Sequence, residues 1–219
     1  ENLNPSVVQR YKDLELKRPK YYVNTILAEW TLDSEGRVYD GWDIYPGMED
    51  KPDFTVYGLD FGYGGVDSTS LIKVDYFEGT WYLTEVFSKP KIRMGEVVAL
   101  MKQNNVPLDA RIYADYAVPL FLTEIRLGGY KGIRKCKKGK VTEKVKIMQD
   151  KKIVIIDENK SSQLYYGYIT WSVNEKGKLP HEPDSLAAAR YGILSCNPRT
   201  DKRSLGRAPK RITRSKGYL

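Results

Sequence analysis

Apolar residues in the first half of the chain recur with the two-residue period of strands. Three runs rich in β-branched and aromatic residues predict strands, over 54–62, 68–77 and 80–87. Glu78 and Gly79 separate the second run from the third by two residues, which is the spacing of a tight hairpin. We therefore expect an antiparallel meander of three strands.

Helical and extended patterns alternate after this meander. Apolar residues at helical spacing predict four helices, over 94–105, 119–129, 141–150 and 184–194. Short apolar runs between them predict strands, over 110–115, 132–136 and 152–157. Residues 161–171 predict a short helix that runs into a strand. This order predicts an α/β fold, in which a mixed sheet of antiparallel and parallel strands is flanked by helices.

The two ends of the chain have other patterns. Residues 4–15 and 19–30 predict two helices, and an extended piece over 37–45 follows them. Residues 197–219 hold few apolar side chains, which predicts a flexible tail. All apolar runs are too short for a transmembrane span, so we expect none.

Positive charge is concentrated in two segments. The chain has 36 Lys and Arg against 28 Asp and Glu, a net charge of +8. Ten basic and two acidic residues lie between Lys131 and Lys152, and eight basic and one acidic between Arg199 and Lys216. The remainder is net acidic. Such a division is typical of a nucleic-acid enzyme that binds metal with carboxylates and phosphates with Lys and Arg, although solvated loops are also Lys-rich.

The residue inventory excludes several kinds of chemistry. Two cysteines cannot form a disulfide framework, and a single histidine, His181, leaves little for a zinc site or a Ser/His/Asp triad. No phosphate-binding G-x-x-x-x-G-K-[ST] motif occurs. If the chain is an enzyme, the remaining chemistry is that of carboxylates with a hard metal ion.

Three aspartates stand at the ends of predicted elements. Asp60 ends an apolar strand, where an unpaired charge is costly, and the glycines at 62, 64 and 65 predict room beside it for a phosphate or a metal ion. Asp115 ends the strand 110–115, and Asp184 opens the last helix. Carboxylates so placed can converge on two divalent ions. Taken singly, Asp115 is explained as a turn residue and Asp184 as a helix cap.

Three motifs in order carry a family resemblance. YGLDFGYGGVDSTSLIKV resembles the first nuclease motif of the large terminase subunits of tailed bacteriophages, and IYADYAVPLFLTEIRLGGYKGI is similar to their second. PDSLAAARYGIL resembles their last helix, usually H-x-x-D-A-x-R-Y. Residues 4–45 look like the piece that joins ATPase and nuclease domains. The resemblance covers roughly residues 4–195.

The resemblance implies an RNase H-like fold and a function. It implies a two-metal endonuclease, using Mg²⁺ or Mn²⁺, that cuts concatemeric double-stranded viral DNA during genome packaging. The implied division is 1–50 as linker helices and an extended segment from a missing N-terminal ATPase domain, 51–196 as the nuclease domain, and 197–219 as a basic, flexible tail. Implied partners are double-stranded DNA, the ATPase domain, the portal and the small terminase subunit, in the cytoplasm of the infected host and docked on the viral procapsid.

The same resemblance implies catalytic and metal-binding roles for Asp60 and Asp115. The last motif departs from the family, because aligning Arg190 and Tyr191 with its R-Y puts Asp184 where the family has His and Ala187 where it has Asp. Asp184 lies three residues before position 187, on the same helix face. We therefore expect Asp184 to complete the site.

Other candidates for the third ligand stay open. His181 and Glu182 precede the last helix, and Asp67 follows the first motif, where a turn-capping role is the simpler interpretation. An inactivated site is a further alternative.

Residues of the first basic segment are expected to bind DNA near the carboxylates: Lys131, Arg134, Lys135, Lys137, Lys138, Lys140, Lys144 and Lys146. Two alternatives to the packaging nuclease remain. One is a DNA-clamping module with a degenerate site, and the other is a different RNase H-like nuclease such as a resolvase or integrase. The joining segment 4–45 argues against the second.

Overall fold

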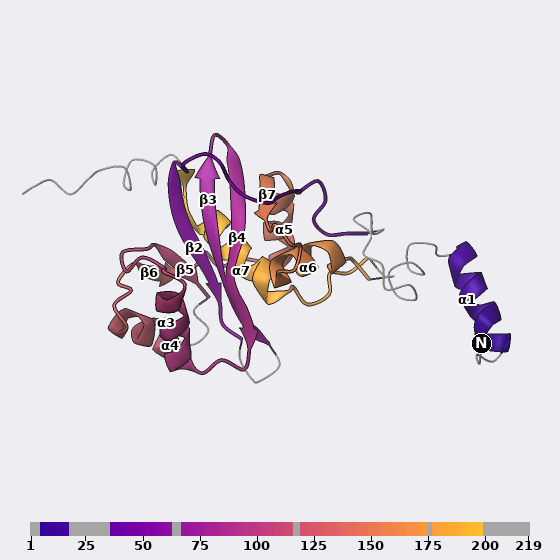
Figure 1. The fold of residues 1–219 in the computed structure, drawn as a ribbon, viewed down its shortest axis with the longest axis horizontal. Coiled ribbons are helices and arrows are strands. Elements are labelled where there is room, and N and C mark those ends of the chain that lie inside the picture. Colours follow the sequence, from indigo (N-terminus) through magenta and orange to yellow (C-terminus); the bar gives the residue numbers. More distant parts are fainter. Residues whose placement is uncertain (1–4, 18–35, 63–66, 116–118, 175–176, 199–219) are drawn as a thin grey trace, which may run out of the picture.

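The computed structural model describes residues 5–17, 36–62, 67–115, 119–174 and 177–198 (Figure 1). The predicted helix over 19–30, and the predicted tail apart from residues 197 and 198, lie outside these residues. The helix predicted over 4–15 is α1 (Pro5–Lys17). No helix within the described ranges is long and apolar enough to cross a membrane.

A seven-stranded mixed sheet forms the centre of the fold, with the order β1-β7-β4-β3-β2-β5-β6. Its antiparallel meander is β2 (Phe54–Asp60), β3 (Ser68–Phe77) and β4 (Thr80–Pro90), which confirms the predicted hairpins. The flanking strands pair in parallel: β5 (Ile112–Ala114) with β2, β6 (Ile133–Lys135) with β5, and β7 (Lys152–Ile156) with β4. The predicted α/β mixed sheet is therefore confirmed.

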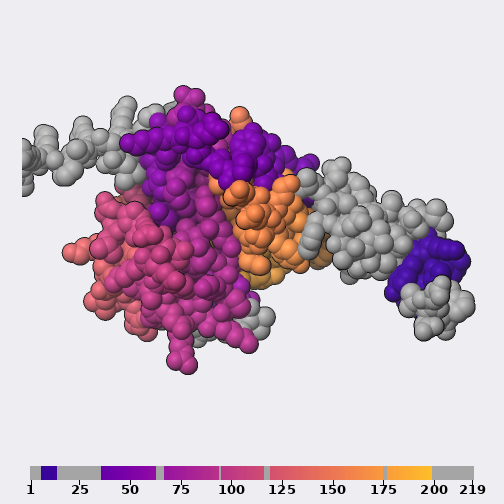
Figure 2. Space-filling view, in the orientation of Figure 1, coloured from indigo at the N-terminus to yellow at the C-terminus, as the bar shows by residue number. Residues whose placement is uncertain are grey.

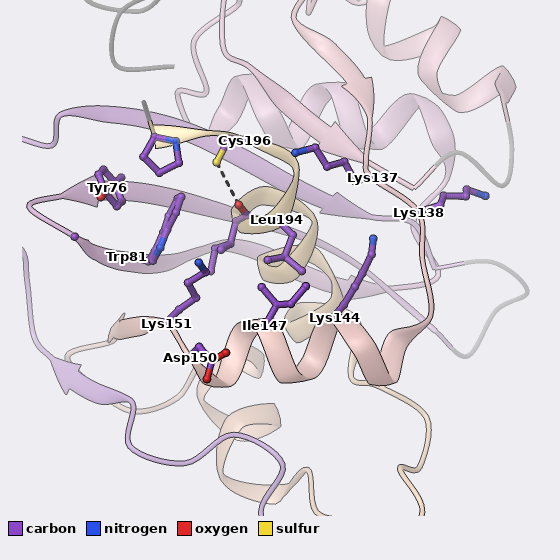
Figure 3. A pocket seen from close by; sticks show the side chains of 13 residues that line it. Tyr76, Trp81, Lys137, Lys138, Lys144, Ile147, Asp150, Lys151, Leu194 and Cys196 are labelled. Carbon is purple, nitrogen blue, oxygen red and sulfur yellow. Dashed lines mark hydrogen bonds between the residues drawn. The ribbon is translucent and has the colours of Figure 1, made fainter. Parts of the chain in front are cut away.

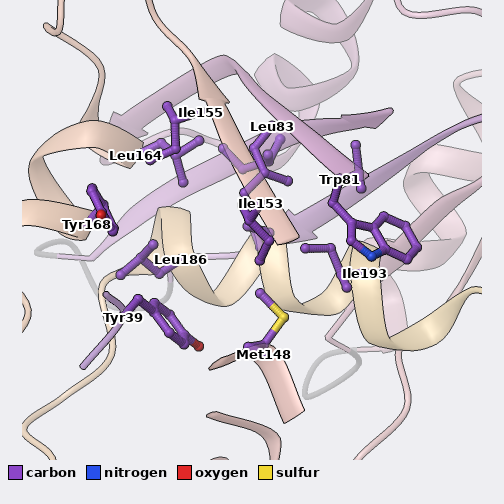
Figure 4. Packing of buried hydrophobic residues seen from close by; sticks show 14 of the residues in the cluster. Tyr39, Trp81, Leu83, Met148, Ile153, Ile155, Leu164, Tyr168, Leu186 and Ile193 are labelled. Carbon is purple, nitrogen blue, oxygen red and sulfur yellow. The ribbon is translucent and has the colours of Figure 1, made fainter. Parts of the chain in front are cut away.

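Helices cover both faces of this sheet. On one face lie α3 (Met94–Gln103) and α4 (Pro119–Leu127), and on the other α5 (Val141–Gln149), α6 (Gln163–Thr170) and α7 (Asp184–Ser195). Figure 4 shows Met148, Leu164 and Leu186, one from each of the last three helices, packed with Ile153 of β7 in one core. A smaller core under α3 and α4 fills the other face.

The extended piece over 37–45 joins the larger core. β1 (Asp43–Tyr45) pairs in parallel with β7 at the sheet edge, and Val38, Tyr39 and Trp42 are buried. This segment, purple in Figure 2, runs along the orange residues of α6, and the Val38 amide donates to the Trp171 carbonyl at 2.9 Å. A domain boundary at residue 50 stays a prediction.

One predicted element is wrong. Within 161–171 the helix α6 spans Gln163–Thr170. No strand follows it in this described stretch, where only Ser172 bridges to Arg37. The Trp171 amide still bonds the Gly167 carbonyl, so the helical pattern continues to the end of the apolar run. Apolar residues on the buried side of a short helix and of a strand look alike in sequence, which explains the error.

Close contact between β2 and α7 requires two glycines. A Cβ atom on Gly58 would lie 1.8 Å from the Ala188 carbonyl oxygen, and one on Gly192 would lie 2.7 Å from a Val74 methyl group. Because side chains alternate along a strand, Gly58 and Asp60 point to the same face, the one that α7 covers. The strand that carries Asp60 is thus pressed against the helix that carries Asp184.

Candidate active site

Two of the predicted site residues meet because their strands are parallel neighbours. Leu59 pairs with Ala114, so Asp60 at the end of β2 and Asp115 just after β5 leave the same edge of the sheet. Open α/β sheets place their sites at this carboxyl edge. The predicted positions of both aspartates at strand ends are confirmed, while their roles stay predictions.

Asp184 reaches the same edge from α7. It is the first residue of the helix, and its carboxylate accepts a hydrogen bond at 2.7 Å from the Ser68 amide at the start of β3. This contact ties the helix to the strand next to β2. The simpler explanation of Asp184 as a helix cap is wrong, because Pro183 occupies the cap position and the Asp184 side chain binds another element.

Asp60 is the carboxylate most affected by its surroundings in this site. Burial raises the pKa of Asp60 well above its usual range, and the negative charges of Asp184 and then Asp115 raise it further. The pKa of Asp184 is also raised, mainly by burial and against the effect of the Ser68 amide. Mutual repulsion of this kind is relieved by a bound cation.

A lysine lies beside one of these carboxylates. The Lys138 ammonium is 3.6 Å from Asp115 Oδ1, and both side chains are partly open to solvent. Nothing in the sequence indicates this pair, because Lys138 belongs to a loop more than twenty residues after Asp115. It places a positive charge at the edge of the carboxylate site.

Glu182 is engaged elsewhere. Arg190 Nε donates to its two carboxylate oxygens at 2.9 and 3.1 Å, Arg190 Nη2 also contacts it, and both side chains are buried. Of the alternatives for the third ligand, His181 is exposed and Asp67 lies in a bend before β3. Both contribute charge near Asp184: Asp67 raises its pKa and His181 lowers it.

The space predicted beside Gly62 is absent. A Cβ atom there would lie 2.3 Å from the Asp67 carbonyl oxygen, so the backbone of the β2–β3 turn fills the position. The Gly62 amide donates to Thr69 Oγ1 at 3.2 Å. Glycine at 62 therefore serves close backbone packing; positions 64 and 65 lie outside the described residues.

The carboxylate oxygens of this site fit a hard divalent cation, whereas the carboxylates do not lie close enough together to enclose a single ion. Carboxylate oxygens are the ligands that Mg²⁺ and Mn²⁺ prefer. Across the described ranges, however, no three Asp, Glu, His or Cys side chains are grouped closely enough to hold one metal ion. The structure offers a pair of aspartates at neighbouring strand ends, together with Asp184 at the start of α7.

The basic segment does not form one uniform surface. Seven of its eight predicted DNA-binding side chains are exposed, in agreement with the prediction of a basic surface. Lys144 differs, since it is only 8% exposed on the inner side of α5. The reason is its helical position, next to Val145 and one turn before Met148, both in the core.

Comparison with known proteins finds similarity in three-dimensional structure but not in sequence. No model of a known protein family matches the chain, and no curated protein matches it in sequence. The nuclease domain of the large terminase g2p from bacteriophage SPP1, with bound Mn, is similar in fold, with a TM-score of 0.60, 21% identity and coverage of 71% of this chain and 96% of that one.

Two further structures are similar. The P22 large terminase nuclease domain has a TM-score of 0.62 and 15% identity, over 81% of this chain and 100% of that one. A large terminase from a thermophilic bacteriophage has a TM-score of 0.56 and 21% identity, over 88% of this chain. The match covers 52% of that protein, so the chain spans about half its length. This chain has the RNase H-like fold of the nuclease domains of phage large terminases.

Proposed function

We propose that the chain is the nuclease part of a viral DNA-packaging motor, a metal-dependent endonuclease that cuts concatemeric double-stranded DNA. One observation carries the proposal: Asp60 and Asp115 end neighbouring parallel strands beneath a helix that begins with Asp184. Three carboxylates at the carboxyl edge of this sheet, two of which raise the pKa of the third, fit phosphodiester hydrolysis with divalent ions.

Asp60, Asp115 and Asp184 hold the metal ions in this proposal. Two Mg²⁺ or Mn²⁺ ions held by these carboxylates would lower the pKa of a water molecule and stabilise negative charge on the leaving oxygen. The raised pKa of Asp60 supports this assignment, because burial and the neighbouring carboxylates Asp184 and Asp115 disfavour its charge, which a bound cation would stabilise. The count of two ions rests on the reaction class.

Other side chains position these carboxylates. The Ser68 amide orients the Asp184 carboxylate, and the Glu182–Arg190 pair fixes the chain that enters α7 against the middle of the same helix. Lys138 lies beside Asp115 and supplies a positive charge on the side from which a phosphate approaches. Together these contacts hold the start of α7 over the end of β2 while leaving the Asp184 carboxylate accessible.

The partners follow from the same proposal. The chain would work joined to an ATPase domain, with the portal and the small terminase subunit, in the cytoplasm of an infected bacterium and on the viral procapsid. A DNA-clamping module with a degenerate site, and a resolvase or integrase, are less favoured, because the solved structures similar in fold are terminase nuclease domains.

Plasmid cleavage tests the proposal. Supercoiled plasmid incubated with the purified chain should be nicked and linearised in Mn²⁺ or Mg²⁺ and stay intact in EDTA. Asp60→Ala and Asp115→Ala should each abolish cleavage while keeping a cooperative unfolding transition. Asp109→Ala is the matched control, since Asp109 is an exposed aspartate ahead of β5. Full cleavage by either site variant, or no cleavage by the parent chain, contradicts the proposal.

A further inference from the structure

A pocket of about 560 Å³ lies between α5 and the C-terminal end of α7 (Figure 3). Tyr76 and Trp81 line one end, at the β3–β4 hairpin, while Lys137 and Lys138 line the other. Ile147 and Leu194 supply apolar surface between them. The pocket is thus partly apolar and has a basic end.

Lys144 is the buried cation of this pocket. It lines the cavity although it is only 8% exposed, and no described carboxylate forms an ion pair with it. The nearest acids have other partners, since Glu182 binds Arg190 and Asp115 lies beside Lys138. A lysine that is more than nine-tenths buried without a carboxylate partner is costly, so an anion in the cavity would stabilise its charge.

The surrounding charge also favours an anion. Lys137, Lys138 and Lys151 line the same cavity, against a single acidic residue, Asp150. Burial lowers the pKa of Lys144, and the positive charge of Arg190 lowers it further. An anion bound in the pocket would offset both effects.

The pocket begins where the carboxylate site ends. Lys138 belongs to both, because it lines the cavity and lies 3.6 Å from Asp115 Oδ1. A phosphodiester strand presents phosphates at regular intervals, joined by sugars that suit the apolar surface of Ile147 and Leu194. A strand with one phosphate at the carboxylates could thus run past Lys138 into this cavity.

We propose that this pocket binds a backbone phosphate of the DNA strand that is cut, with Lys144 as its buried anchoring cation. This inference rests on the proposed nuclease function and adds a phosphate site beside the carboxylates. The pocket contributes register along the strand, because a phosphate contact positions the backbone without reading its sequence.

Salt dependence of DNA binding tests the inference. Anisotropy of a labelled duplex of about 20 base pairs, in EDTA and from about 50 to 300 mM salt, gives the log–log slope of the affinity. Lys144→Met should make this slope shallower by about 0.9 and weaken binding at low salt by roughly five- to twenty-fold. Lys102→Met is the control, an exposed lysine in α3 on the other face of the sheet, and should change the slope by less than half as much.

A second pocket variant covers the case in which Lys144→Met fails to fold. Lys137→Met changes an exposed side chain of the same cavity, and should also make the slope shallower by about 0.9. An unchanged slope in the folded pocket variants, or an equal change in Lys102→Met, overturns the inference. Because this assay contains no divalent metal, its failure is separate from a failure of plasmid cleavage.

Inorganic phosphate distinguishes a DNA phosphate from a free anion. If the proposed site binds a phosphate, free phosphate should displace the labelled duplex from the parent chain more than chloride does at equal ionic strength. The same excess effect should be smaller for Lys144→Met. If phosphate raises the melting temperature of the parent chain but not of Lys144→Met, while the DNA slopes are equal, the pocket is a site for a free anion. That outcome overturns the assignment to DNA.

Discussion

Arg190, in the middle of α7, donates hydrogen bonds from Nε and Nη2 to the carboxylate of Glu182, which lies two residues before the helix begins. The pair is buried, with side chains 4% and 7% exposed. It fastens the entering chain to its own helix and sets where Asp184 starts. The two residues are therefore structural supports of the candidate site.

Removing one partner should be far worse than removing both charges. Arg190→Met leaves the Glu182 carboxylate buried and unpaired, so we expect it to lower the free energy of unfolding by about 3–5 kcal/mol. The double variant Glu182→Gln, Arg190→Met should recover at least a third of this loss. Urea unfolding of the parent chain, both single variants and the double variant measures the coupling. Strictly additive losses would contradict the pairing.

Burial of Asp60, with the nearby charges of Asp184 and Asp115, should make the metal-free protein less stable as pH rises. Its folded pKa lies above the unfolded value of about 3.9, so the folded state binds the proton more tightly. The resulting stability is present at low pH and is lost as pH rises through the folded pKa.

The variant Asp60→Asn removes this contribution. Its free energy of unfolding should fall less between about pH 4 and pH 8 than that of the parent chain, and exceed it at neutral pH. Part of the fall should remain, since the pKa of Asp184 is raised as well. Denaturant unfolding in EDTA across this range provides the measurement. Parallel pH profiles for the two proteins would show that folding does not raise the pKa of Asp60.

Lys138 should compete with a metal ion for Asp115. The pair is solvent-exposed and worth up to about 1 kcal/mol, so Lys138→Met should tighten Mn²⁺ binding by up to about fivefold. Lys137→Met serves as the control, because that lysine is adjacent and forms no ion pair with Asp115. Free Mn²⁺ measured by electron paramagnetic resonance gives both dissociation constants. Equal constants for the two variants would remove Lys138 from the metal site.

Asp184 and Glu182 should separate function from stability. Asp184→Asn keeps the side chain's shape but removes a carboxylate from the site, so it should lower plasmid cleavage at least tenfold with little change in melting temperature. Glu182→Gln should lower the melting temperature, because it leaves Arg190 without its counter-charge, and retain most cleavage at a temperature where it is folded. The reverse pattern would make Glu182 the third ligand.

Much of the fold could be predicted from local patterns, because each strand and helix carries its own period. The predicted meander and the alternating helices and strands match the structure. The signals behind them, the Glu78-Gly79 turn and the helical spacing of apolar residues, depend only on residues close together in the sequence. The strand expected at the end of 161–171 failed because burial by α7, a tertiary effect, decides between helix and strand there. Asp60 and Asp115 could be identified from the sequence as carboxylates at strand ends, both by the predicted strands and by the motifs that contain them.

The supporting residues could not be predicted in the same way. Lys138 meets Asp115, and Lys144 turns inward, only because α5 and α7 pack on the same face of the sheet. Nor does an eight-residue separation reveal that Glu182 and Arg190 bind each other, since Glu182 precedes the helix. Such contacts depend on how elements meet in space, which no local period encodes.

Anomalous scattering from a crystal grown with Mn²⁺ tests the central claim most directly. The account predicts anomalous density at the carboxyl edge of β2 and β5, with carboxylate oxygens of Asp60 and Asp115 at about 2.0–2.4 Å from an ion and Asp184 beside it. Anomalous density elsewhere, or an Asp115 that keeps Lys138 while no ion binds Asp60 at saturating Mn²⁺, would contradict the assignment of these aspartates as the metal site.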